Sequence, residues 1–334
     1  MLAIPGYVGS ALDPLIGVLG DTARRRAALV VGGVGFALSA MLSSVALGFA
    51  VLLVALVIGN PATGAFVSLA QATLMDLDPS RREQNMARWT LAGSLGYVAG
   101  PLLIAASLSM GMGWRAPIFA LGACALPLAA WARRLPRADE GTAASLRGGF
   151  AHAFGALRRR DVLRWLALLE AADLLIDVFH GFLALYFVDV THSDPRAAAV
   201  AVAVWTGAGF VGDAALVALL RVVDGTTYLR LSAAAALVAY PAFLLAGSSS
   251  VKLALVAVLG LLNSGWYAIP KAGLYGSLPG RSGAAVAVGG VGGIVGASVP
   301  LMLGFVATSV GLAAAMWVLL LAPLALVVAT PRDR

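Results

Sequence analysis

The chain is poor in charged residues and has a single cysteine. Only 12% of its 334 residues are Asp, Glu, Lys or Arg, whereas 60% are hydrophobic. Soluble domains carry about 25% charged and about 45–50% apolar residues, so the composition excludes an ordinary soluble enzyme. Cys124 alone cannot form an intrachain disulfide, which excludes a disulfide-rich scaffold. Because the mean hydropathy is +0.92, lipid must be the solvent for most of the chain.

Residues that build metal or nucleophile sites are also scarce. The chain has three His, and His152 and His192 lie in expected connections without a second ligand residue nearby. Gly207, Gly209 and Gly212 match a dinucleotide-binding fingerprint, but they lie inside an apolar run, where the strand–turn–helix unit of that fingerprint cannot form. We therefore expect no enzyme, no cofactor and no metal site.

Long apolar runs follow one another along the whole chain. Each is long enough to cross a bilayer core of about 30 Å as a helix. The sequence thus predicts an all-α polytopic membrane protein. Its eleven expected spans are residues 3–20, 27–48, 50–75, 88–109, 114–132, 163–188, 197–221, 228–246, 252–277, 283–308 and 312–330.

Basic residues are distributed unevenly over the connections. Nineteen of the 23 Lys and Arg residues follow the odd-numbered spans one to nine or lie in the C-terminal tail. Arg115, Arg196 and Lys252 lie on the opposite side, and Lys271 lies within a span. The Arg-rich side is expected in the cytoplasm, together with the C-terminus, in a plasma (inner) membrane. This asymmetry accounts for the net charge of +7 without a nucleic-acid partner.

Landmarks recur along the chain at a constant spacing. Asp21 precedes an Arg cluster as Asp224 precedes Arg230, and Pro101 corresponds to Pro300, so the offsets are about 199–203 residues. We therefore expect two pseudo-symmetric bundles, with five helices in 1–132 and six in 162–334, joined by a cytoplasmic linker at 133–161. Within the linker, residues 144–160 form either an amphipathic helix on the anionic leaflet or a solvated loop.

The repeat leaves one helix unmatched. The first span of the second half begins near residue 163, and an offset of 200 puts its counterpart before residue 1. Two explanations are open: a sequence truncated at its start, which we expect, or a natural eleven-span variant.

Several motifs resemble those of the major facilitator superfamily. In "GVLGDTARRR", Gly17, Asp21, Arg25 and Arg26 match the loop signature between that family's second and third helices. Thr22 and Arg24 depart from it. The likeness covers the whole chain and implies a transporter whose two bundles rock around a central site. It also implies that Asp21, Arg25 and Arg26 form a gate, for which simple membrane anchoring is the alternative.

A second motif is similar to the fifth-helix motif of the family's drug/proton exporters. Gly96, Gly100 and Pro101 in "GYVAGPLLIA" match it as a helix-packing motif, whereas Ile104 and Ala105 replace its closing glycines. The family's usual arginine in the fourth helix is absent from the stretch 55–60, "ALVIGN". The resemblance therefore favours export and leaves the proton-carrying group to be found elsewhere.

The sixth span carries an unusual set of ionisable residues. Glu170, Asp173, Asp177 and His180 have helical offsets of 0, 3, 7 and 10, which put them on one face. Charges inside a span are expensive, and neighbouring carboxylates share protons, so this set is a candidate proton carrier. A buried polar network that braces the helices is the alternative.

Three residues of the ninth span complete the candidate site. Lys271 could pair with Glu170 or Asp173 or attract an anionic substrate, unless its side chain extends to the membrane interface. Trp266 and Tyr267 could stack on an apolar or aromatic substrate, with packing as the alternative.

These observations favour a monomeric secondary transporter, not an enzyme, whose partners are lipid, protons and a small molecule. Proton-coupled efflux of a small amphiphilic molecule is the expected function. The alternatives are a proton symporter for uptake of a small metabolite, and a non-transporting membrane scaffold or sensor.

The topology is testable by cysteine labelling in a Cys124→Ala background. Ser145→Cys should react with an impermeant thiol reagent only after the membrane is permeabilised, whereas Ser193→Cys should react from outside. Labelling in the opposite sense would overturn the orientation derived from the Arg distribution.

Overall fold

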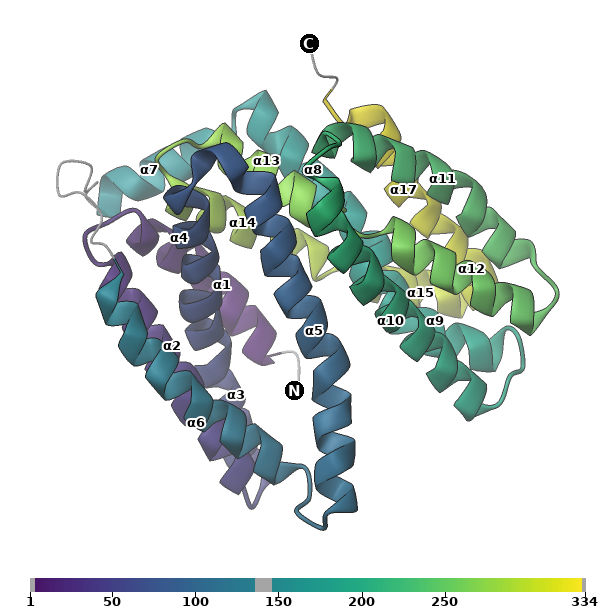
Figure 1. Ribbon diagram of the computed structural model, residues 1–334, viewed down its shortest axis with the longest axis horizontal. Coiled ribbons are helices and arrows are strands. Elements are labelled where there is room, and N and C mark those ends of the chain that lie inside the picture. Colours follow the sequence, from purple (N-terminus) through teal and green to yellow (C-terminus); the bar gives the residue numbers. More distant parts are fainter. Residues whose placement is uncertain (1–3, 136–145, 332–334) are drawn as a thin grey trace. The chain divides into compact units, whose positions relative to one another are not determined.

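The computed structural model describes residues 4–135 and 146–331, which form helices joined by short connections (Figure 1). No strand occurs among these described residues. The expected all-α class is thereby confirmed. Its physical reason is that a backbone in lipid must satisfy its N–H and C=O groups internally, and a helix does so within one segment.

The first helices lie N-terminal to residue 136. They are α1 (Ile4–Gly20), α2 (Arg25–Val45), α3 (Phe49–Thr63), a π-helical turn (Gly64–Ser68), α4 (Leu69–Leu77), a 3-10 turn (Pro79–Arg81), α5 (Arg82–Ser109), α6 (Arg115–Trp131) and a 3-10 turn (Ala132–Arg134). Together, α3, the π-helical turn and α4 form one continuous apolar span.

The second group begins with the linker helix. It comprises α7 (Leu146–Ala156), α8 (Arg160–Asp173), a π-helical turn (Leu174–Val178), α9 (Phe179–Asp189), α10 (Pro195–Leu219), α11 (Gly225–Leu245), α12 (Ser249–Leu262), α13 (Ala268–Ser277), α14 (Ser282–Gly296), α15 (Val299–Val310), α16 (Leu312–Ala315), a 3-10 turn (Met316–Leu320) and α17 (Leu321–Ala329).

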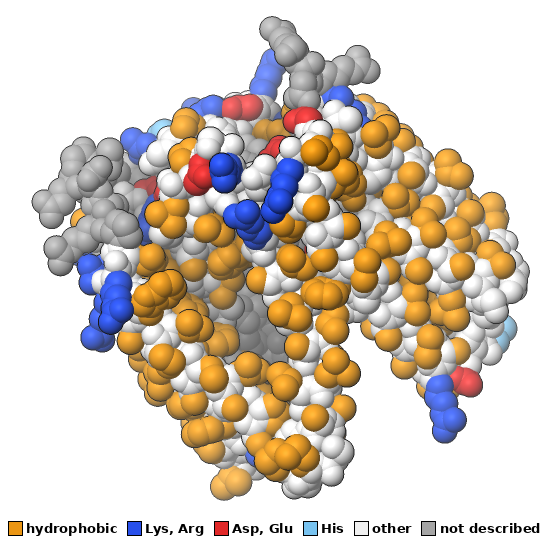
Figure 2. All heavy atoms as spheres, in the orientation of Figure 1, with side chains coloured by type: hydrophobic (Ala, Val, Ile, Leu, Met, Phe, Trp, Pro, Cys, Tyr) orange, Lys and Arg blue, Asp and Glu red, His pale blue; other side chains and the backbone are white. Residues whose placement is uncertain are grey.

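Nine of the eleven expected spans are long, apolar helices among the described residues. The other two, 3–20 and 252–277, overlap shorter apolar helices, Ala11–Gly20 and Ser249–Leu262. Hydrophobic side chains cover most of the visible helix surface, and Lys and Arg gather near helix ends (Figure 2). This distribution fits helices whose sides face lipid.

The expectation of one continuous helix over 252–277 is wrong. Residues 263–267 form a turn between α12 and α13, in which Gly265 has a positive φ of 82°. Pro270 follows in the first turn of α13, where its missing N–H would have no intrahelical partner. The π-helical turn Gly64–Ser68 lies one repeat offset earlier, so both halves distort the same part of the same span.

The described chain divides into two compact units. The first comprises Met1–Ser80, Ala99–Leu163 and Leu274–Ile294, and the second comprises Arg81–Val98, Arg164–Gly273 and Val295–Arg334. In the first unit, α2 packs against α6 and against the π-helical turn through small residues. A side chain on Gly33 would overlap Ala129 and Phe66. Close helix contact through small residues is the usual basis of packing in lipid, where helices gain little from hydrophobic burial.

An aromatic core organises the second unit. Phe179 of α9 makes edge contacts with Trp205, Tyr240 and Phe243, at ring-centroid distances of 4.9, 5.7 and 5.4 Å. Such edge-to-face pairs add stabilisation beyond the area they bury. They join α9, α10 and α11.

Lys252, which the charge distribution places on the Arg-poor side, is buried in this unit. Its Nζ donates hydrogen bonds to the Phe243 and Leu244 carbonyls at 2.6 and 3.2 Å, and to the Tyr186 hydroxyl at 3.0 Å. The ammonium also lies 5.0 Å from the ring centroids of Tyr186 and Phe243. It therefore satisfies the carbonyls at the C-terminal end of α11, where the helix dipole favours a cation.

Lys252→Met should lower the free energy of unfolding by about 1–3 kcal/mol, because buried carbonyls lose a charged donor. Thermal unfolding of the purified protein measures the effect. Val251→Met changes the neighbouring residue, which is 49% exposed, and should leave the unfolding temperature unchanged. Equal unfolding temperatures for the two variants would show that Lys252 does not stabilise the end of α11.

Candidate functional site

The four ionisable residues of the sixth span lie together in the second unit. Glu170 and Asp173 belong to α8, Asp177 to the π-helical turn and His180 to α9. Asp173 interacts electrostatically with both Asp177 and Glu170, and Asp177 interacts with His180. None of the four is fully buried. Glu170, Asp173 and His180 are half-buried, and Asp177 is exposed.

The same span has an apolar face built by residues four apart. Leu175, Phe179 and Leu183 are fully buried in the core of the unit. The π-helical turn Leu174–Val178 widens the helix between Asp173 and His180. Turns of this kind are rare and frequently occur at functional sites.

Lys271 of α13 lies within electrostatic range of Glu170 and Asp173. Pairing of Lys271 with either carboxylate stays a prediction. Glu170 also packs against Gly296, the last residue of α14, because a Cβ at that glycine would overlap the carboxylate. Residues of two other helices, Lys271 of α13 and Gly296 of α14, thus lie near Glu170, which no spacing within the sequence could specify.

The two aromatic candidates differ in their surroundings. Trp266 is fully buried, and its indole N–H donates a 2.9 Å hydrogen bond to the Ser232 hydroxyl of α11. This burial favours the packing alternative for Trp266. Tyr267, by contrast, is only partly buried and remains a candidate.

The glycines of the fifth-helix motif do not support the expected close packing. A Cβ on Gly96 or Gly100 of α5 would meet no atom within 4 Å among the described residues, and Pro101 is exposed. The tight contacts of the second unit occur elsewhere. Gly260 of α12 approaches the backbone of α10 at Trp205 and Gly209.

In the first unit, Asp21 caps the N-terminus of α14. Its two carboxylate oxygens accept hydrogen bonds from the backbone N–H groups of Gly283 and Ala284, at 2.6 and 2.7 Å. Burial raises the pKa of the Asp21 carboxyl, while these hydrogen bonds and the charge of Arg25 act in the opposite direction. A carboxylate at this position satisfies free helix N–H groups and complements the helix dipole.

Arg25 extends this contact to α4. Its guanidinium donates 2.7 Å hydrogen bonds to Asp76 and to the Ser282 hydroxyl, and Ser282 in turn donates to Asp76 at 2.5 Å. Arg25 also lies 3.6 Å from Asp21. Arg26 is half-buried and takes no part in this network among the described residues. The structure therefore brings together two of the three expected gate residues.

Two glycines allow the helices to meet at this network. A Cβ on Gly17 of α1 would overlap the backbone of Gly283 and Ala287, and a Cβ on Gly283 would overlap Gly17 and Asp21. Backbone-to-backbone contact excludes any larger residue without a shift of the helices. It accounts for the glycine that opens the loop signature.

Sequence reasoning missed several polar partners. Asp76 and Ser282 are not among the residues expected from the sequence, yet both bind Arg25. Asp213 is 6% exposed within α10 and accepts a hydrogen bond from the Ser94 hydroxyl of α5. A carboxylate inside a span is a signal in itself, but its partner lies more than 100 residues away.

An offset of 200 relates Asp213 to Asp13 of α1. Asp13, and Gly212 next to Asp213, each lie beside the irregular turn of their own half. The Asp13 carboxylate lies against Gly64 at the π-helical turn, and Gly212 lies against Ser264 at the interruption of the other half. The offset of 200 residues therefore relates aspartates and irregular turns within the spans, as well as motifs in the connections.

The described residues contain no group of three or more His, Cys, Asp or Glu that could hold a metal ion. Lys271 can attract an anion, and Asp21 binds the N-terminal end of a helix. The acidic face can exchange protons and attract cations, and the Asp21 network can hold two helices together.

Comparison with protein families gives one match over most of the chain. A family described as the Major Facilitator Superfamily matches residues 1–299. Major facilitator superfamily domain-containing protein 10 of Bos taurus is 34% identical over 181 residues, which are 50% of this chain and 38% of that protein. The Homo sapiens protein of the same name is 33% identical over 177 residues, with the same two coverages. The match therefore spans well under half the length of these relatives.

Solved structures share the fold over nearly the whole chain. The MFS transporter FucP in the outward conformation has a TM-score of 0.78 and 17% identity, and the match covers 98% of this chain and 89% of that one. A variant of the E. coli fucose:proton symporter FucP has a TM-score of 0.79 and 16% identity, with 98% and 92% covered. At these identities the likeness concerns the fold.

Proposed function

The chain belongs to the Major Facilitator Superfamily, and from this premise we propose that it is a proton-coupled exporter of a small amphiphilic molecule. Membrane transport follows from the family and from a fold shared with solved transporters. Proton coupling, outward direction and the class of substrate are our proposal. So are a monomeric state and a plasma-membrane location with a cytoplasmic C-terminus.

The acidic face of the sixth span supports proton coupling. Asp173 interacts with two other carboxylates and with Lys271. Ionised carboxylates repel one another strongly where the dielectric is low, and one bound proton relieves that repulsion. A cluster that gains a proton on one side of the membrane and loses it on the other changes the balance between two conformations.

The remaining candidates support a substrate with both polar and apolar parts. Tyr267 offers a partly exposed aromatic ring four residues before Lys271. Lys271, Glu170 and His180 offer ionisable groups for the polar part of such a molecule. An amphiphilic molecule can engage a ring and an ionised group at once.

The Asp21 network supports a gate. One carboxylate holds two N–H groups of α14, and Arg25 links that contact to Asp76. Such a compact contact can form in one conformation and break in another, because each of its bonds joins separate helices. Arg26 belongs to the proposed gate only through its place in the loop signature.

Two alternatives follow from the same residues. A proton symporter would use the acidic face for uptake, and a scaffold or sensor would not move a substrate at all. Flux in proteoliposomes separates them. Proton-driven efflux supports the proposal, proton-driven accumulation supports the symporter, and no flux in either direction supports the scaffold.

Asp173→Asn or Asp177→Asn should retain counterflow exchange and lose transport driven by a pH gradient. The amide fixes a neutral state, so the protein can still bind substrate but this position can no longer carry the proton. Flux against pH in vesicles is the measurement. Asp189→Asn is the matched control, because Asp189 is exposed at the end of the same span. Unchanged pH dependence in both cluster variants would leave the acidic face as polar packing.

Asp21→Asn should impair flux more than expression. The amide lacks the charge of the carboxylate and has one acceptor oxygen where two N–H groups must be bound. Asp194→Asn provides a control, since Asp194 caps α10 through the Ala197 N–H within its own helix. Normal flux in Asp21→Asn would assign the loop to membrane anchoring and not to a gate.

A further inference from the structure

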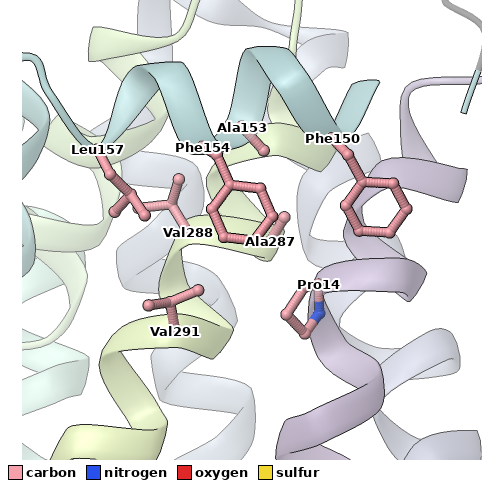
Figure 3. A pocket seen from close by; sticks show the side chains of 8 residues that line it. All are labelled: Pro14, Phe150, Ala153, Phe154, Leu157, Ala287, Val288 and Val291. Atoms are coloured by element: carbon pink, nitrogen blue, oxygen red, sulfur yellow. The ribbon is translucent and has the colours of Figure 1, made fainter. Parts of the chain in front are cut away.

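The linker helix α7 lies across the two helices that Asp21 joins. Gly149 of α7 packs on Val18 of α1, because a Cβ at that glycine would overlap the Val18 side chain. Val18 is 1% exposed and lies three residues before Asp21. Figure 3 shows the apolar side chains of this contact, which are Phe150, Ala153, Phe154 and Leu157 on the linker side, Pro14 of α1, and Ala287, Val288 and Val291 of α14. The helix α7 thus packs against both partners of the Asp21 contact.

His152, which the sequence places in a connection, belongs to this helix. It follows Gly149 by three residues and precedes Ala156 by four, and both of these residues are buried. Residues three and four apart are neighbours on a helix surface, so His152 borders the packed face of α7. Its own side chain is exposed. The imidazole can therefore exchange protons with solvent.

The charges that act on His152 come from separate segments of the chain. Arg281, directly before α14, and Asp21, directly after α1, both interact electrostatically with the imidazole, and so does Arg159 after α7. The other charged residues of these segments and of those beside them are Arg147 and Arg158 near the ends of α7, Asp13 of α1, Arg24, Arg25 and Arg26 before and within α2, and Asp76 of α4. Arg25 and Asp76 bind each other. His152 is thus placed between an arginine and the carboxylate of the proposed gate.

This environment disfavours the charged imidazole. Loss of solvent on the side that faces the unit lowers the pKa of His152, the charges of Arg281 and Arg159 lower it as well, and Asp21 acts in the opposite direction. Once α7 leaves α1 and α14, the imidazole regains its ordinary pKa of about 6.5. The packed position of α7 is therefore fully stabilised above about pH 6.5 and loses stability as the pH falls towards the lower value of the packed state.

We propose that α7 is a strap across the contact between α1 and α14, and that protonation of His152 loosens it. The charged imidazole and Arg281 are then like charges, and their repulsion is relieved when α7 moves away. This inference rests on the proposed gate, because the strap covers the helices that Asp21 joins through the Gly283 and Ala284 N–H groups. Acidification on the linker side of the membrane then favours the conformation in which that contact is broken.

Hydrogen–deuterium exchange of the purified full-length protein tests the strap, since amide exchange reports local opening. The peptide that covers 146–156 is followed at about pH 8 and about pH 5.5, on either side of the ordinary imidazole pKa. Rates are corrected for the intrinsic effect of pH on amide exchange. We expect the protection of α7 to fall about two- to fivefold at the lower pH, the size of one partly screened charge pair. Equal protection at the two pH values would overturn the proposal.

His152→Gln should abolish this pH response, because the amide stays neutral. His192→Gln is the matched control, since His192 is also exposed but lies in the connection between α9 and α10, and it should respond as the wild type does. Burial raises the pKa of Asp21, so Asp21 also gains a proton on acidification, but it is present in both variants. An equal pH response in His152→Gln and the wild type would assign the response to Asp21 or another group and refute the role of His152.

Arg281→Gln tests the repulsion itself. Without that guanidinium, the attraction of Asp21 is opposed by the charge of Arg159 alone, and the pH response of α7 should shrink. An undiminished response would contradict the proposed cause of the loosening.

The strap and the gate can fail separately, because exchange in α7 needs neither substrate nor a gradient. Normal flux in Asp21→Asn together with a pH response that depends on His152 would reject the gate and retain the strap. Impaired flux in Asp21→Asn without a pH response in α7 would retain the gate and reject the strap.

Discussion

The backbone of this chain must satisfy its own hydrogen bonds, because the lipid around it offers none. Helices meet that requirement along most of each span, and the ends and distortions need other partners. Lys252 supplies them at the end of α11, and Asp21 supplies them at the start of α14. These two charged residues thus lie where one helix ends and another begins.

Small residues determine how closely these helices approach. Gly17 and Gly283 bring α1 and α14 into backbone contact, which is why a single carboxylate can reach two N–H groups of the neighbouring helix. The helices of the second unit pack through aromatic rings instead, and Phe179 contacts rings of α10 and α11. Among the described residues, neither kind of packing fully buries Glu170, Asp173, Asp177 or His180.

The two halves share more than their spacing. The same offset of 200 residues relates Asp13 to Asp213, and relates the π-helical turn Gly64–Ser68 to the interruption before α13. A break in a span exposes backbone groups that nearby polar side chains can satisfy, so polar residues and irregular winding occur together. The proposed transport residues on α8, the π-helical turn and α13 follow the same pattern.

Composition and periodicity sufficed for the all-α membrane class and for the positions of most spans, because apolar length and charge asymmetry are local properties of the chain. The clustering of Glu170, Asp173 and Asp177 was also predictable, since one helix carries all three. Tertiary structure decided the rest. It buried Trp266 and Lys252, left open space at the Cβ position of Gly96 within the described part of the chain, and joined Asp21 to Gly283 across 262 residues. These outcomes depend on which helices meet and at what depth, which no single segment of sequence specifies.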